Sequence, residues 1–142
     1  MTLITGDRVG VNAEGRPVSV QQAEGRKNIP VRMRYANGHS YAVPLDAQRL
    51  IVRGKLDERL FDVTLLSGPE YRTSQHAGLK VIVNFAGARP AAKAEVRGAG
   101  STVVRRTFPR LNAEAVSIPQ DDASEIWEAI TDKAASGSPW TT

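Results

Sequence analysis

The feature that most constrains the fold is the order of elements that the hydrophobic pattern predicts after residue 79. Residues 80–85 (KVIVNF) include three consecutive β-branched residues, which predicts a strand with Val81, Val83 and Phe85 on one face. The segments that follow are alternating or Ala-rich and are bounded by Gly, Pro and Asp residues. The elements predicted here are a strand (80–85), a helix (89–99), two strands (102–108 and 114–118) and a closing helix that Asp121 or Asp122 caps and that runs to about 133.

This order matches most of a ferredoxin-like β-α-β-β-α-β unit, without its final strand. Residues 137–142 (GSPWTT) are few, and Pro139 cannot donate to a strand ladder. We therefore expect an α/β sandwich that lacks a clear final strand. The strand over 80–85 would then keep an unpaired edge, which makes a homodimer through that strand a further expectation.

Residues 1–66 show a different pattern, in which short β-branched segments alternate with turn residues. Asn37-Gly38 is the strongest hairpin signal in the chain. Asp46 is expected to cap a helix over 47–52 that ends at Gly54. The strands predicted in this half lie over 2–5, 8–11, 18–21, 30–35 and 40–43, with a short helical turn over 56–60.

The segment 67–78 separates the two halves, because it contains two Gly, a Pro and a Ser-Gln-His run without a clear period. The predicted fold class is therefore α+β. Its parts are a small antiparallel β module with short helices (1–66), a linker (67–78), the ferredoxin-like unit (79–136) and a short tail (137–142).

Residues that usually carry chemistry are few. The chain has no Cys, which excludes a disulfide scaffold, a thiol nucleophile and thiolate zinc sites. Its two histidines, His39 and His76, are expected in exposed loops without partners at a useful spacing. Gly98 and Gly100 follow a helix, whereas a phosphate-binding loop precedes one. We therefore expect a binding or folding module that is not an enzyme and holds no cofactor and no metal.

Charge is unevenly distributed along a chain whose formal net charge is +4. Residues 80–110 contain seven basic residues and one acidic residue, whereas six acidic residues and one basic residue follow from 111 onward. Differently solvated faces of one fold, or a surface matched to a charged partner, would produce this asymmetry. The acidic cluster at 57–62 is assigned to helix capping, because Asp57 lies beside Arg59 at a helix start.

Two alternatives to a protein-binding role remain open. Nucleic acid could bind to the basic residues of 80–110, particularly to Arg105 and Arg106. However, no aromatic residues alternate with these basic residues to form a platform on which bases could stack. A small ligand or carbohydrate could bind at Tyr35, His39 and Tyr41, although aromatic residues beside a hairpin turn usually pack across strands. No apolar run approaches the roughly 20 residues of a membrane span, so no membrane partner is expected.

Several blocks of the first half resemble one family. TLITGDRV (2–9), YAVPLD (41–46), GKLD (54–57) and LFDVT (60–64) look like the N-terminal pro-region of secreted subtilisin-like serine proteases of actinobacteria. The strands and helices expected over 80–133 are similar to the subtilisin propeptide, the inhibitor domain of such enzymes. The resemblance implies an intramolecular chaperone that then inhibits a subtilisin-like serine protease competitively.

In that family, the open face of the propeptide sheet packs on two surface helices of the protease, and the C-terminal tail lies in the active-site cleft like a substrate. The resemblance implies secretion, although residues 1–7 do not read as a signal peptide, and a cytoplasmic location is the alternative. The catalytic domain is not in this chain, so no proteolytic activity is expected. The residues expected to contact the protease are Phe108, Pro109, Arg110, Leu111 and Asn112 in a hairpin, and Pro139, Trp140, Thr141 and Thr142 in the tail.

Overall fold

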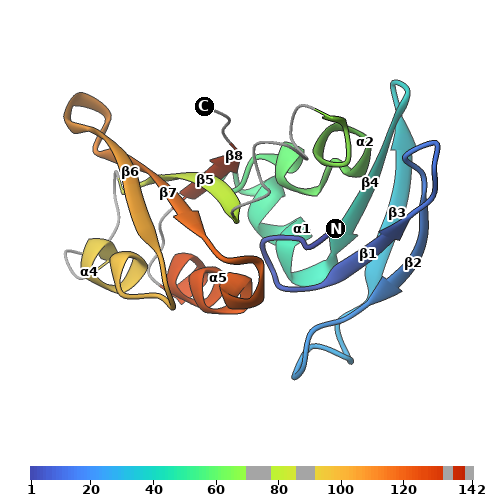
Figure 1. Cartoon of the computed structure of the whole chain (residues 1–142), viewed down its shortest axis with the longest axis horizontal. Coiled ribbons are helices and arrows are strands. Elements are labelled where there is room, and N and C mark those ends of the chain that lie inside the picture. Colours follow the sequence, from blue (N-terminus) through green and yellow to red (C-terminus); the bar gives the residue numbers. More distant parts are fainter. Residues whose placement is uncertain (70–77, 86–91, 133–135, 140–142) are drawn as a thin grey trace.

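Short strands form in the first half because β-branched residues there alternate with Gly, Asn and Asp residues that turn the chain. The computed structural model describes residues 1–69, 78–85, 92–132 and 136–139 (Figure 1). The elements of the first half are the hairpin of β1 (Arg8–Val11) and β2 (Pro17–Gln21), the hairpin of β3 (Val31–Ala36) and β4 (His39–Pro44), and the helices α1 (Leu45–Val52), η1 (Glu58–Phe61, a 3-10 helix) and α2 (Val63–Leu66).

The turn between β3 and β4 confirms the strongest local prediction. Asn37 and Gly38 have φ values of 53° and 79°. A two-residue hairpin turn of this kind needs a positive φ at both central positions, which Asn and Gly adopt at low cost. The dipeptide therefore sets the register in which Tyr35 pairs with Ser40 and Arg34 pairs with Tyr41.

The strand predicted over 2–5 is wrong. Thr2 makes only an isolated bridge to Arg8, and the chain then turns, with the Gly6 N–H donating to the Leu3 carbonyl at 2.9 Å. The turn carries Leu3 and Ile4 into the core, where both are buried. Gly6 is required at this point, because its φ is +91° and a Cβ there would collide with the Ser124 side chain.

The second half forms one antiparallel sheet in the order β6-β7-β5-β8. Helices α4 and α5 lie on the same side of this sheet (Figure 1). Its elements are β5 (Leu79–Asn84), α4 (Ala92–Arg97), β6 (Val103–Phe108), the 3-10 helix η2 (Pro109–Leu111), β7 (Ala113–Ile118), the 3-10 helix η3 (Gln120–Asp122), α5 (Ala123–Asp132) and β8 (Ser136–Pro139).

The expectation that the final strand is missing is wrong. β8 pairs antiparallel with β5, from Ser136 opposite Asn84 to Pro139 opposite Val81. Proline is tolerated there because β8 is an edge strand and Pro139 is its last residue. As a consequence, β5 is a central strand with partners on both sides, and the unpaired edge expected at 80–85 does not exist. A homodimer through that strand therefore has no free edge to use.

The two faces of the sheet differ in what they bury. Val81 and Val83 are buried with the α5 side chains in the hydrophobic core, which places them on the helix side of the sheet. Glu114 pairs with Val83 in the register and lies on the same side. Its carboxylate, 1% exposed, accepts a hydrogen bond from Arg97 Nη2 of α4 at 2.7 Å, which compensates for burying the charge.

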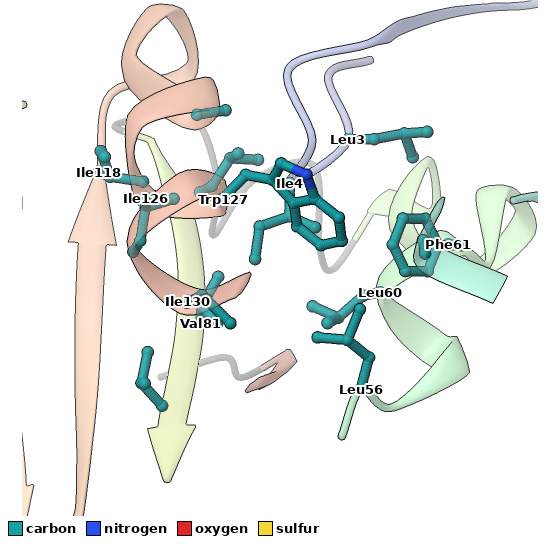
Figure 2. Close-up of a cluster of buried hydrophobic side chains, with 14 of the residues drawn as sticks. Leu3, Ile4, Leu56, Leu60, Phe61, Val81, Ile118, Ile126, Trp127 and Ile130 are labelled. Carbon is teal, nitrogen blue, oxygen red and sulfur yellow. The ribbon is translucent and has the colours of Figure 1, made fainter. Parts of the chain in front are cut away.

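The hydrophobic core is continuous between the two halves of the chain. Figure 2 shows Ile4 and Leu60 of the first half beside Trp127 of α5, and these side chains belong to one buried cluster with Leu3 and Phe61. The two halves thus share apolar contacts instead of each closing its own core. The division at 67–78 stays a prediction, since residues 70–77 lie outside the described residues.

A buried ion cluster accompanies this shared core. Arg26 donates from Nε to Asp7 Oδ2 at 3.2 Å, and from Nη1 and Nη2 to the two oxygens of Asp46 at 2.8 and 2.9 Å. Its Cζ lies 5.8 Å from the Trp127 ring centroid, within the range of a cation–π interaction. The cluster joins the N-terminal turn, the start of α1 and α5.

Asp46 therefore has a different role from the expected helix cap. The residue before α1 is Pro44, and Asp46 lies within the first turn, where Oδ1 accepts from the Ala47 N–H at 3.0 Å. Burial alone would raise the pKa of Asp46, but hydrogen bonding and charge from Arg26 outweigh burial and hold that pKa below its ordinary value. Asp46 is thus a charged partner of Arg26 at neutral pH.

Replacing Arg26 with Ala should lower the free energy of unfolding by about 3 kcal/mol, because Asp7 would keep a buried charge without its ionic partner. Arg8→Ala is the matched control, since the Arg8–Asp121 pair is exposed and its loss should cost less than about 1 kcal/mol. Urea denaturation of both variants measures the difference. Equal losses in the two variants would contradict a central role for the Arg26 cluster.

Leu60→Ala should loosen both halves of the chain, because Leu60 contributes to the shared core. A loss of about 3 kcal/mol is typical for such a truncation of a buried Leu. Native-state hydrogen exchange should show faster exchange of β7 amides as well as of β4 amides. Val52→Ala, at an exposed position of α1, is the control. Acceleration confined to residues 1–69 would show instead that the halves unfold independently.

Candidate functional site

The predicted contact residues 108–112 form the connection between β6 and β7. Phe108 ends β6 half-buried and pairs with Ala113 in the register. Pro109 begins η2, where its fixed φ suits the first helical position. Arg110 is exposed, and the Leu111 side chain is 64% exposed. The structure therefore presents a basic and an apolar side chain side by side at the tip of this hairpin.

Asn112 gives the tip its shape. Its φ of 50° and ψ of 47° are left-handed, a conformation that Asn adopts more readily than most residues. Its N–H donates to the Pro109 carbonyl at 3.3 Å, and its carbonyl accepts from the Phe85 N–H at 2.8 Å. Asn112 thus closes η2 and attaches the tip to the end of β5.

The other predicted contact residues lie elsewhere. Pro139 is in β8, at the edge of the sheet opposite to β6, and pairs with Val81. Because Val81 also pairs with Val116, Pro139 is three register positions from the hairpin end of the sheet, where Ala113 pairs with Asn84. The structure therefore separates the two predicted contact regions. Residues Trp140, Thr141 and Thr142 lie outside the described residues.

The sheet surface opposite α4 and α5 links the two regions. We call it the helix-free face, because the described helices of the second half, α4 and α5, lie on the other side. The strand register assigns residues to it, because residues paired across antiparallel strands point to the same side. Its central residues, on β7, have small, buried side chains, while its residues on β6 have larger side chains that are exposed or half-buried. Its members on the three strands with described side chains are Lys80, Ile82, Asn84, Val103, Arg106, Phe108, Ala113, Ala115 and Ser117.

A bulge modifies the edge of the helix-free face. The register between β6 and β7 shifts between Val104, which pairs with Val116, and Arg106, which pairs with Ala115. Arg105 is thus an extra residue in the edge strand, next to Arg106, and both side chains are exposed. Bulges of this kind re-aim side chains and are frequent at sheet edges and near functional sites. The sequence showed two adjacent arginines but could not show the bulge, which depends on the partner strand.

His39 has a partner that sequence reasoning missed. It is the first residue of β4, where an exposed loop was expected, and its Nδ1 lies 2.7 Å from Oδ2 of the buried Asp62. The other oxygen of Asp62 accepts from the Leu65 N–H and caps α2. No sequence signal joined the two residues, because they are 23 positions apart. His76 lies outside the described residues.

The remaining members of the acidic cluster at 57–62 have separate partners. Asp57 caps η1 and accepts from the N–H and guanidinium of Arg59, which confirms the capping prediction. The hydrogen bond from Arg59 holds the pKa of Asp57 below its ordinary value despite partial burial. Glu58 instead pairs with Arg34 at 2.6 Å. The cluster is therefore not a pair of carboxylates arranged for acid–base chemistry.

The aromatic residues near the β3–β4 turn do not form one platform. Tyr35 pairs with Ser40 and Tyr41 pairs with Arg34, so the two tyrosines point to opposite faces of the hairpin. The Arg34 guanidinium lies over the Tyr41 ring at 4.8 Å, and Tyr35 is 74% exposed. The residues proposed for a small ligand are thus split between two faces.

Among residues 1–69, 78–85, 92–132 and 136–139, no three His, Asp or Glu side chains gather where they could hold a metal ion. Within the same ranges, no helix combines the length and the apolar character that a membrane crossing needs.

Asn112→Ala should lower the free energy of unfolding by about 1 kcal/mol, because a Cβ-bearing residue without the Asn amide resists the left-handed conformation. Asn112→Gly should leave stability within about 0.5 kcal/mol of the parent, because Gly adopts a positive φ freely. Chemical denaturation compares the two variants. A larger loss for Gly than for Ala would show that the Asn112 side chain, and not its backbone, shapes the tip.

Comparison of the chain with protein-family models, with curated proteins and with solved structures gave no match.

Proposed function

We propose that this chain is a propeptide-like protein that assists the folding of a subtilisin-like serine protease and inhibits it competitively. In this proposal its second half is a ferredoxin-like, subtilisin-propeptide-like unit. The β-α-β-β-α-β order of β5 to β8 and the sheet order β6-β7-β5-β8 support this reading. The chain itself acts as a binding module and not as an enzyme.

The observation that carries the proposal is the helix-free face. Sheets with both helices on one side leave the other side available to a partner. Here the central residues Ala113, Ala115 and Ser117 are small and already buried, so a partner would contact the larger side chains beside them. At its β6 edge, Val103 is 46% exposed and could add apolar contact area.

Inhibition would follow from the rigidity of this surface. A sheet that is already formed binds without a large ordering cost. The residues that follow β8 would extend into the substrate cleft of the protease and pair with it through main-chain hydrogen bonds. By the same contacts, the sheet would stabilise the helices on which it packs while the protease folds.

The direct test is to add the chain to a subtilisin-type protease at micromolar concentration and to follow hydrolysis of a chromogenic peptide. We expect the apparent KM to rise while kcat stays constant. Val103→Glu should weaken inhibition at least about tenfold, because it adds a charge at the contact face. Val52→Glu, at a more exposed position on α1, should inhibit like the parent. Absence of inhibition by the parent chain at micromolar concentration would overturn the proposal.

A further inference from the structure

Charge is divided between the two sides of the second half. On the helix side, Glu95, Glu125 and Glu128 line a groove between α4 and α5. On the β6 side, Arg105, Arg106 and Arg110 are all exposed, and no acidic residue occurs in β6 or η2. These three residues are called the arginine edge below.

The arginine edge is not neutralised by the described part of the fold. The salt bridges within that part involve other basic residues, and none reaches Arg105, Arg106 or Arg110. Elsewhere in the second half, Arg97 is paired with the buried Glu114. Three exposed cations therefore lie in β6 and η2, at one edge of the sheet, and none of them forms a salt bridge with a described residue.

The backbone concentrates these charges. The bulge in β6 inserts Arg105 beside Arg106, so that two guanidinium groups occur where a regular strand would direct one to this side. Arg110 follows in η2, immediately beyond the end of β6. Guanidinium groups form planar, bidentate hydrogen bonds with carboxylates, which favours a carboxylate-bearing partner.

Apolar side chains lie among the arginines. Val103 is 46% and Leu111 64% exposed, one near each end of the arginine edge. Binding of single-stranded nucleic acid usually relies on exposed aromatic rings that stack on the bases. The one aromatic residue in β6 and η2, Phe108, is half-buried. Arginines with aliphatic neighbours are instead typical of protein interfaces.

We propose that the arginine edge docks on a carboxylate-rich surface of the partner protease, next to the surface that the helix-free face covers. This inference rests on the proposed function and adds the chemistry of the partner. The attraction accelerates association and sets the orientation in which the sheet meets the protease.

A second copy of the chain fits the arginine edge less well than an acidic surface of a protease does. The acidic groove of one copy lies on the helix side, whereas the arginine edge borders the opposite face. Docking of one on the other would be head-to-tail and would build open chains, not a closed dimer. The net charge of +4 also opposes self-association.

The test compares the triple variant Arg105→Glu, Arg106→Glu, Arg110→Glu with the control Arg16→Glu, Arg32→Glu, Arg53→Glu. Both replace three exposed arginines and change the net charge equally. Glu at the β6 edge keeps that edge charged, so any role of charge in preventing strand pairing is preserved. Surface plasmon resonance with an immobilised, active-site-blocked subtilisin-type protease measures the rate constants at 50 and 500 mM NaCl.

For the parent chain, the association rate constant should fall about tenfold between 50 and 500 mM NaCl. The triple variant should associate at least about 30-fold more slowly than the parent at 50 mM NaCl. Because its charge is reversed, its association rate constant should rise and not fall as the salt concentration increases. The control should stay within about threefold of the parent. Circular dichroism and thermal unfolding verify that both variants are folded.

The outcomes separate the two proposals. If the parent binds and inhibits the protease but the triple variant behaves like the control, docking through the arginine edge is contradicted while the proposed function stands. If the parent does not bind the protease at either salt concentration, the proposed function itself fails. Two further outcomes would overturn this inference. One is tight binding of single-stranded RNA by the parent that only the triple variant loses. The other is concentration-dependent self-association of the parent that only the triple variant loses.

Discussion

The Arg26 guanidinium connects parts of the chain that no local signal joins. It pairs with Asp7 in the N-terminal turn and with Asp46 in α1, and it lies over Trp127 of α5. A planar group with five N–H donors can serve several acceptors at once while its face contacts an aromatic ring. Because Asp7 is almost fully buried, its charge is tolerated only beside such a partner. This cluster and the shared apolar core together join the first half to α5.

The shared core has a consequence for the surface of the second half. The core side chains of the sheet, Val81, Val83, Val116 and Ile118, lie on its helix side, where the first half also contributes Leu60 and Phe61. The helix-free face contributes none of the large buried side chains of that core. The core therefore does not use the arginine edge or the exposed Val103, and both can serve a partner, as the proposed docking on an acidic surface of a protease requires.

The hairpin predicted over 108–112 is present, while its contact with a protease stays a prediction. The segment 108–112 forms a hairpin tip with Arg110 and Leu111 exposed, because Pro109 and Asn112 are turn residues whose backbone preferences act locally. By contrast, the β6 bulge exists only through pairing with β7, and the placement of Pro139 at the opposite edge exists only through pairing with β5. The His39–Asp62 pair was invisible for the same reason.

What the sequence by itself determined is the type and order of the elements: the strand over 80–85, the Asn37-Gly38 turn, the capping role of Asp57 and the α+β class. These features depend on residues within a few positions of one another, whose periodicity and backbone preferences can be seen directly. The tertiary structure alone decided that β8 completes the sheet, that Asp46 serves Arg26 instead of a helix end, and which face of the sheet α4 and α5 cover. These features depend on contacts between distant segments, whose free energy is gained only when the chain closes the loops between them and buries both partners together.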